Sequence, residues 1–589
     1  MKSLKYSWLI SPRLDFLFFI GAPLLIIPGF QLLSSFVSVA AIKLGVMGIS
    51  ATGHHLPGFI RAYTDKSIFN QFKLRLILVP TLFILMALSA GIFKLTFVFW
   101  ILIVWGTWHG AMQILGFLRI YDAKAGFQSQ STARLDFWMC LTWFVQVVFW
   151  STGKKMTIFS SFYMGGGPLL PATWIRALET GWLVLTAAVT AAFLHRFLDN
   201  WFRHGYLNLP KLLCMVASFG FWAYCMISIQ HLIIGLVLWE IFHDAQYNVF
   251  VWNYNRNRVA KDFSQSRIER FLFRTDWRKT AFYALCIAAY GSFGLLMQDA
   301  LGIYQSVASA DSMLFQIGNV FAASAMMHFY LDGFIWKIRD GKVRKDLGLE
   351  TTESFKKRPI GVHWALVGLL MIVAGGMGFS EYFQWNKAQV PYRSNNLVDL
   401  VPKSGYANFM KASGFRSEGL ADSAILYYER AIRFDADYEF SHLFIGDLKS
   451  RGGDLEGAIP HYEIAARLEP EDMVIKGNLA ALYSQTGRYD RAEKEYRGLL
   501  ASDSLNPEHA YQLAWSLLQM KKGQAAKPYL ELTLRLNPDQ PKALNYLGMV
   551  EHSAGNLDKA RRLYEHSLEL DTAYTHAREN LAALKTPGP

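Results

Sequence analysis

The stretch from Trp239 to Asn257, WEIFHDAQYNVFVWNYNRN, places ionisable side chains at the end of a long apolar segment. It continues the run LLCMVASFGFWAYCMISIQHLIIGLVLWE (212–240), which is apolar enough to lie in a lipid bilayer. Four polar side chains fall at offsets 0, 3, 4 and 7, and so share one face of a helix: Glu240, His243, Asp244 and Tyr247. Ionisable groups in a membrane segment are costly and normally face a bundle interior, where they serve a function. The stretch therefore predicts a membrane helix that forms one wall of a functional site.

The composition of the chain is apolar overall, and the apolar residues lie mostly before residue 381. Of 589 residues, 52% are hydrophobic and 18% are charged, whereas soluble domains usually carry about 25% charge. The net charge is +13, but the cations cluster between apolar runs, which is typical of membrane topology and disfavours nucleic acid as a partner. The cysteines lie inside apolar runs without CxxC spacing, which disfavours a disulfide framework or a thiolate zinc site: Cys140, Cys214, Cys225 and Cys286.

Eleven membrane helices are expected before residue 381, because a span needs about 20 mostly apolar residues. They cover residues 16–38, 41–60, 76–93, 97–118, 136–151, 174–195, 211–228, 231–251, 279–298, 312–336 and 360–380. The first is expected to be a retained helix, since no small-residue cleavage site follows it. Residues 211–251 could instead form one long bent helix, which would reverse the orientation of everything before it.

Lysine and arginine residues concentrate in alternate connections between these expected helices. They follow the second, fourth, sixth and tenth helices, and eight of them lie between Arg256 and Lys279. Because cytoplasmic loops carry an excess of such residues, the pattern predicts a cytoplasmic N-terminus and an extracytoplasmic C-terminus. The expected location is a bacterial-type inner membrane.

The last third of the chain contains a repeat of 34 residues. Alanine recurs with this period at Ala424, Ala458, Ala492, Ala526 and Ala560. Four residues later stand Tyr428, Tyr462, Tyr496, Leu530 and Tyr564, and small residues stand twelve before each alanine. The pattern resembles the tetratricopeptide repeat (TPR), which implies paired helices that stack into a solenoid and bind a protein partner in a groove.

The sequence therefore predicts an all-α protein in two parts. A polytopic transmembrane helix bundle is expected over residues 1–380 and a linker over 381–404. An α-solenoid of about five repeats is expected to follow, with a capping helix near its end, over residues 405–585.

Histidines on separate expected helices fall at one depth in the membrane. They are His54, His55, His109, His243 and His328. Counted from His55, His109, His243 and His328, the next cation follows after 6, 10, 13 and 9 residues, which is ~9–20 Å along a helix. Each has polar company: Gln113 four residues after His109, Asp332 four after His328, and Glu240 three before His243. The Glu-x-x-His spacing is one by which helix bundles present metal ligands.

Imidazole and carboxylate groups without a thiolate suit iron, zinc, copper or manganese. The placement of the histidines resembles the Brp/Blh-type membrane dioxygenases, although that family has no repeat tail. The resemblance implies a non-haem iron held by His55 or His54 together with His109, His243 and His328. It also implies a hydrophobic substrate that reaches the site from the bilayer. In this interpretation the carboxylates of Glu240, Asp244 and Asp332 orient ligands or transfer protons, and Tyr247 donates a proton.

Three other functions remain open from the sequence. A non-enzymatic, membrane-anchored assembly factor would use only the repeat groove, with the histidines as packing groups. A membrane glycosyltransferase would need carboxylates in an early extracytoplasmic loop, and the connections near 39–41, 94–96 and 152–173 contain no Asp or Glu. A haem electron-transfer protein would use histidine pairs on facing helices.

Overall fold

A computed structural model describes residues 7–584 of the chain, apart from fourteen internal stretches: 38–40, 43–44, 128, 206, 230–231, 262–266, 274–275, 293–312, 337–342, 345–346, 348, 350–359, 384–389 and 435–438. It divides into two compact units, Met1–Pro402 and Lys403–Pro589. The described residues contain helices and no strand, which confirms the expected all-α class.

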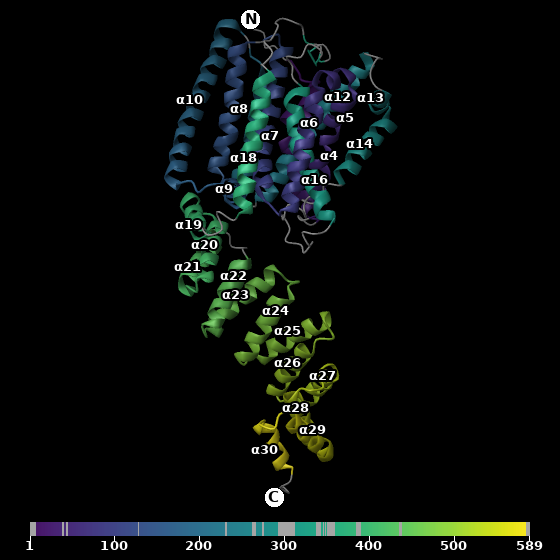
Figure 1. Cartoon of the computed structure of the whole chain (residues 1–589), viewed down its shortest axis with the longest axis vertical. Coiled ribbons are helices and arrows are strands. Elements are labelled where there is room, and N and C mark those ends of the chain that lie inside the picture. Colours follow the sequence, from purple (N-terminus) through teal and green to yellow (C-terminus); the bar gives the residue numbers. More distant parts are fainter. Residues whose placement is uncertain are drawn as a thin grey trace. The chain divides into compact units, whose positions relative to one another are not determined.

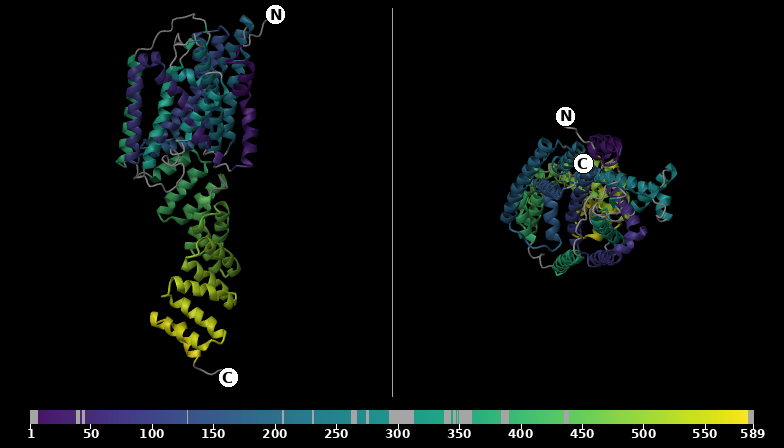
Figure 2. Two further views of the ribbon diagram at one scale, coloured as in Figure 1. Left: turned by 90° about the vertical axis from the view of Figure 1, so that its right-hand side faces the viewer. Right: turned by 90° about the horizontal axis from the view of Figure 1, so that it is seen from above.

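The first unit is a bundle of helices, several of them long and roughly side by side (Figures 1 and 2). Its elements are α1 Pro12–Asp15, η1 Phe16–Ile20, α2 Ala22–Ser34, η2 Gly45–Ser50, α4 Ala51–Gly53, α5 His55–Thr64, α6 Lys66–Ile92, α7 Phe97–Lys124, α8 Gln130–Trp150, α9 Thr152–Met164, α10 Ala172–His204, α11 Leu209–Ala223, η3 Tyr224–Ser228, α12 Leu232–Lys261, α13 Arg267–Leu272, α14 Trp277–Ser292, α16 Met313–Ile335, α18 Ile360–Tyr382 and α19 Val390–Leu400. The segments labelled η are π-helices. The expected linker thus contains α19, which belongs to this unit.

Fewer helices than the expected eleven are long and apolar enough to cross a membrane. Among the described residues there are five, namely Lys66–Ile92, Phe97–Lys124, Ala172–Arg203, Leu209–Ser228 and Gly361–Tyr382. A sixth arises if Pro12–Ile20 and Ala22–Ser34, which meet at 56°, form one broken span. The segment expected over 41–60 is divided into η2, α4 and α5, and α12 carries the polar face described above. Residues 211–251 form two helices rather than one, with 230–231 outside the described residues.

Two sets of carboxylate contacts fix helix ends within the first unit. The Glu381 carboxylate on α18 accepts hydrogen bonds from the backbone N–H groups of Thr96, at 2.7 Å, and Phe97, at 3.1 Å, and so satisfies donors that the start of α7 leaves unpaired. Near the end of α12, Arg258 contacts Asp65 at 2.6 Å and Glu269 at 3.0 Å. These contacts tie α12 to the turn before α6 and to α13.

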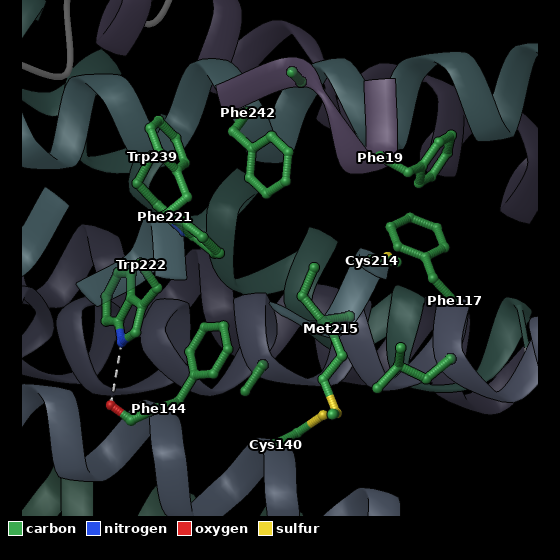
Figure 3. Packing of buried hydrophobic residues seen from close by; sticks show 14 of the residues in the cluster. Phe19, Phe117, Cys140, Phe144, Cys214, Met215, Phe221, Trp222, Trp239 and Phe242 are labelled. Carbon is green, nitrogen blue, oxygen red and sulfur yellow. Dashed lines mark hydrogen bonds between the residues drawn. The ribbon is translucent and has the colours of Figure 1, made fainter. Parts of the chain in front are cut away.

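Aromatic side chains fill the core between α7, α8, α11 and α12 (Figure 3). Trp222 of α11 stacks on Phe144 of α8, with ring centroids 5.2 Å apart, and its indole N–H donates to the Phe144 carbonyl at 3.3 Å. Trp239 of α12 meets Trp222 edge to face at 4.9 Å. This packing sets the position of the helix that carries His243.

The second unit is a series of helix pairs (Figure 2). The pairs are α20 Gly405–Ser417 with α21 Ala421–Phe434, α22 Glu439–Arg451 with α23 Leu455–Leu468, α24 Met473–Gln485 with α25 Tyr489–Ser502, α26 Pro507–Gln519 with α27 Gly523–Leu536, and α28 Pro541–Ser553 with α29 Leu557–Leu570. A final helix, α30 Thr575–Ala583, packs on the last pair. Five pairs and one end helix are what the 34-residue period predicts.

The repeated small residues lie where the two helices of a pair touch. All five repeated alanines are fully buried. A Cβ added at Gly446 would come within 2.7 Å of the Tyr462 ring, and one added at Gly548 within 2.5 Å of the Tyr564 ring. The 34-residue period in the sequence therefore reflects the repeated contact between the two helices of each pair.

Each turn between paired helices contains a residue in the left-handed backbone conformation. Four of these positions, 34 or 68 residues apart, hold glycine: Gly419, Gly453, Gly487 and Gly555. In the fourth repeat the same position holds Lys521, with φ of 60°. A side chain in this conformation costs roughly 1–2 kcal/mol, so Lys521 is a strained site in an otherwise regular array.

Replacement of Lys521 by glycine is expected to stabilise the second unit by about 0.5–1 kcal/mol, because relief of the strain exceeds the added chain entropy of glycine. Urea unfolding of residues 403–589, followed by circular dichroism, measures the change. Lys522→Gly is the control: Lys522 has an ordinary φ of −95°, so glycine there should lower stability. Equal destabilisation by both variants would contradict the prediction.

Candidate metal centre

Four buried histidines from four helical segments lie together in the first unit. One side-chain nitrogen from each of His54, His109, His243 and His328 lies within 4.8 Å of the other three. The exposed fractions of these side chains are 3%, 6%, 4% and 0%. Of the five sequence-predicted ligands, the structure thus brings four into one group.

His54 lies at a break in its helix, after the π-helix η2 and the short α4 and before α5. At this break the backbone packs closely against α14. A Cβ on Gly53 would come within 2.8 Å of the Ile287 carbonyl oxygen. The Nε2 atom of His54 lies 3.0 Å from Nε2 of His328 on α16. The glycine before His54 therefore permits the approach that directs the imidazole into the group.

His109 on α7 and His243 on α12 face each other, with ring centroids 5.2 Å apart. A Cβ on Gly110 would lie 3.4 Å from the Trp239 ring, which shows how closely α7 and α12 pack beside the two histidines. The Gln113 amide donates a hydrogen bond to the His243 backbone carbonyl at 3.1 Å. Gln113 therefore supports α12 rather than the His109 ring.

A carboxylate orients His54. Oδ1 of Asp244 lies 2.9 Å from His54 Nδ1, and the Ser50 hydroxyl donates to Asp244 Oδ2 at 2.7 Å. Because Nδ1 of His54 faces the carboxylate, its Nε2 is the nitrogen left to face the group. This is the arrangement in which an outer carboxylate fixes a metal-binding imidazole.

A second carboxylate lies beside His328. Asp332 Oδ1 accepts hydrogen bonds from the Tyr247 hydroxyl at 3.1 Å and the Trp336 indole at 3.0 Å. Its Oδ2 lies 3.7 Å from Nε2 of His328. Two donors thus hold Asp332 with its other oxygen toward the histidine.

Two predicted residues lie outside this inner group. His55 turns toward α16, where its Nδ1 lies 3.0 Å from the Ser324 hydroxyl, and its ring stacks on His328 at 4.6 Å. Consecutive helical residues point in different directions, which is why only one of the His54–His55 pair joins the four. Glu240 is partly exposed, and it interacts electrostatically with Asp244, His54 and the buried Lys154 of α9.

Several residues of the site were missed by sequence reasoning. Ser50 precedes His54 by four residues, Ser324 precedes His328 by four, and Trp336 follows Asp332 by four. A search for polar residues at this spacing from each predicted ligand would have found all three.

Besides His54 Nδ1, which lies 2.9 Å from Asp244 Oδ1, three imidazole nitrogens of the group have no hydrogen-bond partner among the described residues. They are His109 Nε2, His243 Nδ1 and His328 Nδ1, and all three are buried. Buried polar atoms normally have a partner, and an imidazole nitrogen without a proton accepts a hydrogen bond or binds a metal. The group therefore offers candidate metal ligands.

A separate feature lies in the second unit, where first helices of successive pairs carry neighbouring aromatic side chains. The Tyr546 ring on α28 lies 5.1 Å from Trp515 and 6.3 Å from Tyr511, both on α26. All three are partly exposed. Such aromatic clusters are enriched at protein interfaces.

Gly58 is a sensitive position beside the histidine group, since a Cβ there would lie 3.1 Å from the Tyr247 hydroxyl and 3.4 Å from Asp332 Oδ1. Gly58→Ala is expected to destabilise the chain by about 1–2 kcal/mol through overpacking. Thermal unfolding of the full chain in detergent, followed by tryptophan fluorescence, measures this. Gly116→Ala on α7 is the matched control, because nothing lies within 4 Å of its added Cβ. Equal melting temperatures for the two variants would refute the expectation.

Comparison with known proteins identifies the second unit. Two family models described as tetratricopeptide repeat match residues 451–515 and 511–574. Similar solved structures include YrrB, described as "a TPR protein with an unusual peptide-binding site" (14% identity, 33% of this chain and 98% of that chain, TM-score 0.30), and MamA from Desulfovibrio magneticus RS-1 (14% identity, 29% and 96%, TM-score 0.27). A tetratricopeptide repeat protein from Parabacteroides merdae is 21% identical over 31% of this chain and 72% of its own, with a TM-score of 0.28. The C-terminal unit is a tetratricopeptide repeat domain, a protein-interaction module.

Proposed function

We propose that the four histidines bind a divalent metal ion, iron, and that the first unit is a membrane-embedded oxygenase-like enzyme that acts on a hydrophobic or lipid substrate. The observation that carries the proposal is the convergence of four buried imidazoles, within 4.8 Å, from segments that are far apart in the sequence. The ion would supply the activation of dioxygen, which these side chains do not provide themselves. No thiolate belongs to the group, which favours iron over softer metals.

The distances suit one ion. Metal–nitrogen bonds are ~2.1 Å long, so two nitrogens on one ion are ~3.0 Å apart at a right angle and ~4.2 Å apart when opposite. The Nε2 atoms of His54 and His328, 3.0 Å apart, are close enough to share one ion. The spread of 4.8 Å needs closure by a fraction of an ångström, which small ring rotations provide.

The surrounding residues support the ligands and handle protons. Asp244 holds the His54 ring and is itself held by Ser50. Asp332 is held by hydrogen bonds from Tyr247 and Trp336, and its other oxygen lies beside the His328 ring. Tyr247, whose hydroxyl donates to Asp332, is placed to deliver a proton near the metal. Glu240 lies one turn before Asp244 on α12 and joins Lys154 to this network electrostatically.

The ring contacts argue against haem at this site. Imidazole centroids lie 4.5 Å apart for His54 and His328 and 4.7 Å apart for His109 and His328. Rings in direct contact leave no space for a porphyrin between them. A single ion fits the arrangement better than a macrocycle does.

The proposed setting is the inner membrane, with a cytoplasmic N-terminus and an extracytoplasmic repeat domain. The cation pattern supports it, and so does the placement of α19 in the first unit. Asn396 of α19 donates to the Leu170 carbonyl near the start of α10, at 2.7 Å, whereas Arg196 and Arg203 lie near the other end of α10. The chain therefore leaves this unit near the start of α10, which carries Arg176 and Glu179, and not at the end that carries Arg196 and Arg203.

Metal content of the detergent-purified full chain tests the proposal. We expect close to one iron per chain in the wild type, and loss of the iron in His54→Ala, His109→Ala, His243→Ala and His328→Ala. Asp244→Asn should weaken metal binding by about 10–100-fold, because it removes the carboxylate that orients His54. Elemental analysis and an optical spectrum measure both effects.

The control is His195→Ala, since His195 is exposed on α10 and should not affect the iron. Folded wild-type protein that holds no metal would sink the oxygenase proposal. A Soret band would show haem instead, and the non-haem interpretation would then be wrong.

A second candidate function is a membrane-anchored assembly protein in which the repeat domain is the active part. The aromatic cluster around Tyr546 favours it, because large, partly exposed aromatic side chains on adjacent helices form an anchor for a partner. In this case the histidines would serve only to pack the helix bundle.

A pair of variants separates the two functions. If the repeat domain binds a protein, Trp515→Ala should weaken binding of the cross-linked partner by about tenfold or more, while His243→Ala should leave it unchanged. Quantitative cross-linking in native membranes measures both. If His243→Ala abolishes a metal-dependent activity and Trp515→Ala changes nothing, the assembly function fails.

A further inference from the structure

A hollow in the first unit lies between the end of α7, the start of α8, the last turns of α10 and the start of α11. Its cavity volume is about 50 Å3, and it is partly open to the outside. None of its lining residues belongs to the histidine group. The hollow is therefore a site separate from the candidate metal centre.

Part of the wall of the hollow is apolar. Phe193 and Phe197 of α10 form one side, and Leu212 and Met215 of α11 form another. Only 11% of the apolar stretch of α10 is buried within the unit, so the outer face of this helix is the kind of surface that lipid covers. A hydrocarbon chain could reach these walls from the bilayer.

Asn208, which lines the hollow, has an amide group without a partner. Its side-chain oxygen caps α11 by accepting from the Lys211 backbone N–H at 3.4 Å. This bond identifies which end of the Asn208 amide is the oxygen, and it leaves the Nδ2 group as the donor without a partner. Nδ2 is buried and has no hydrogen-bond partner among the described residues, and Asn208 is only 6% exposed. A buried donor of this kind normally meets an acceptor.

The charges around the hollow leave one arginine unbalanced. Lys211 contacts Asp122 at 2.7 Å and Asp136 at 2.8 Å. Arg119 contacts the same two carboxylates at 3.0 and 3.2 Å, so these four groups cancel. Arg196, at the rim, makes no ion pair with a described residue, and its one hydrogen bond there, to Ser131, is 3.5 Å long. The rim therefore carries a net positive charge beside an unpaired N–H donor.

We propose that this hollow binds the oxyanion head of a lipid, with Asn208 and Arg196 as its donors and the phenylalanine wall of α10 against its chain. A phosphodiester of a phospholipid and the carboxylate of a fatty acid share this chemistry, since both offer charged oxygen acceptors on an apolar tail. The proposal is independent of metal binding.

Native mass spectrometry of delipidated full chain in detergent tests the site with three probes: dioleoylphosphatidylglycerol, oleate and uncharged dioleoylglycerol. Asn208→Asp keeps the cap of α11, because aspartate caps as well as asparagine, but it removes the donor and repels an anion. We expect this variant and Arg196→Gln to bind the charged probe about tenfold more weakly than the wild type. Arg203→Gln is the control, since Arg203 lies on the same helix and pairs with Asp199 outside the hollow.

Each outcome decides the matter. If the two variants bind phosphatidylglycerol more weakly but bind oleate as the wild type does, the hollow is a phospholipid site. If only oleate binding is weakened, it is a fatty-acid site. Equal binding of dioleoylglycerol, or equal loss in Arg203→Gln and Arg196→Gln, overturns the proposal. Iron content measured on the same samples should not change, so failure of this site and failure of the metal proposal are separate results.

Discussion

Two imidazole nitrogens that face each other at 3.0 Å, as those of His54 and His328 do, cannot both present a lone pair. A proton or a cation must lie between them. The buried nitrogens His109 Nε2 and His243 Nδ1 also need a partner, and no described residue provides one. Much of the first unit acts to keep these rings together despite this cost: the break at His54, the aromatic packing of α11 and α12, and the ion pairs of Arg258.

The two carboxylates next to the histidines do different things, although both sit one residue or one turn from a ligand. Asp244 follows His243 in sequence but serves His54 on another helix. Asp332 shares α16 with His328, yet most of its contacts come from Tyr247 and Trp336. Each carboxylate therefore connects helices as well as supporting a ring, so its loss affects the relative placement of two ligands at once.

Sequence reasoning found the parts of the protein that follow a period. The 34-residue repeat gave the helix pairs, because each repeated alanine fills the same contact. Helical spacing predicted the faces of the helices that carry His109, His243 and His328. It could not predict which of His54 and His55 points inward, because a π-helix and a break precede them. It overcounted membrane spans, because apolar composition alone does not reveal that the segment around His54 is broken. The strained turn at Lys521 could have been found by aligning the repeats, where it stands in a column of glycines.

His54 and His328 are separated by 274 residues, and this separation has a consequence for biosynthesis. At about 5–20 residues per second, a ribosome needs roughly 15–55 s to add the intervening chain. In the last part of that time, after His243 has been added, the segments that carry His54, His109 and His243 are all made, but the fourth wall of their site does not exist. Until α16 docks, the earlier helices hold polar groups in an apolar bundle without their final neighbours. A nascent chain that stalls in this interval is an insertion intermediate with its polar interior open, and it is the form that membrane quality control has reason to recognise.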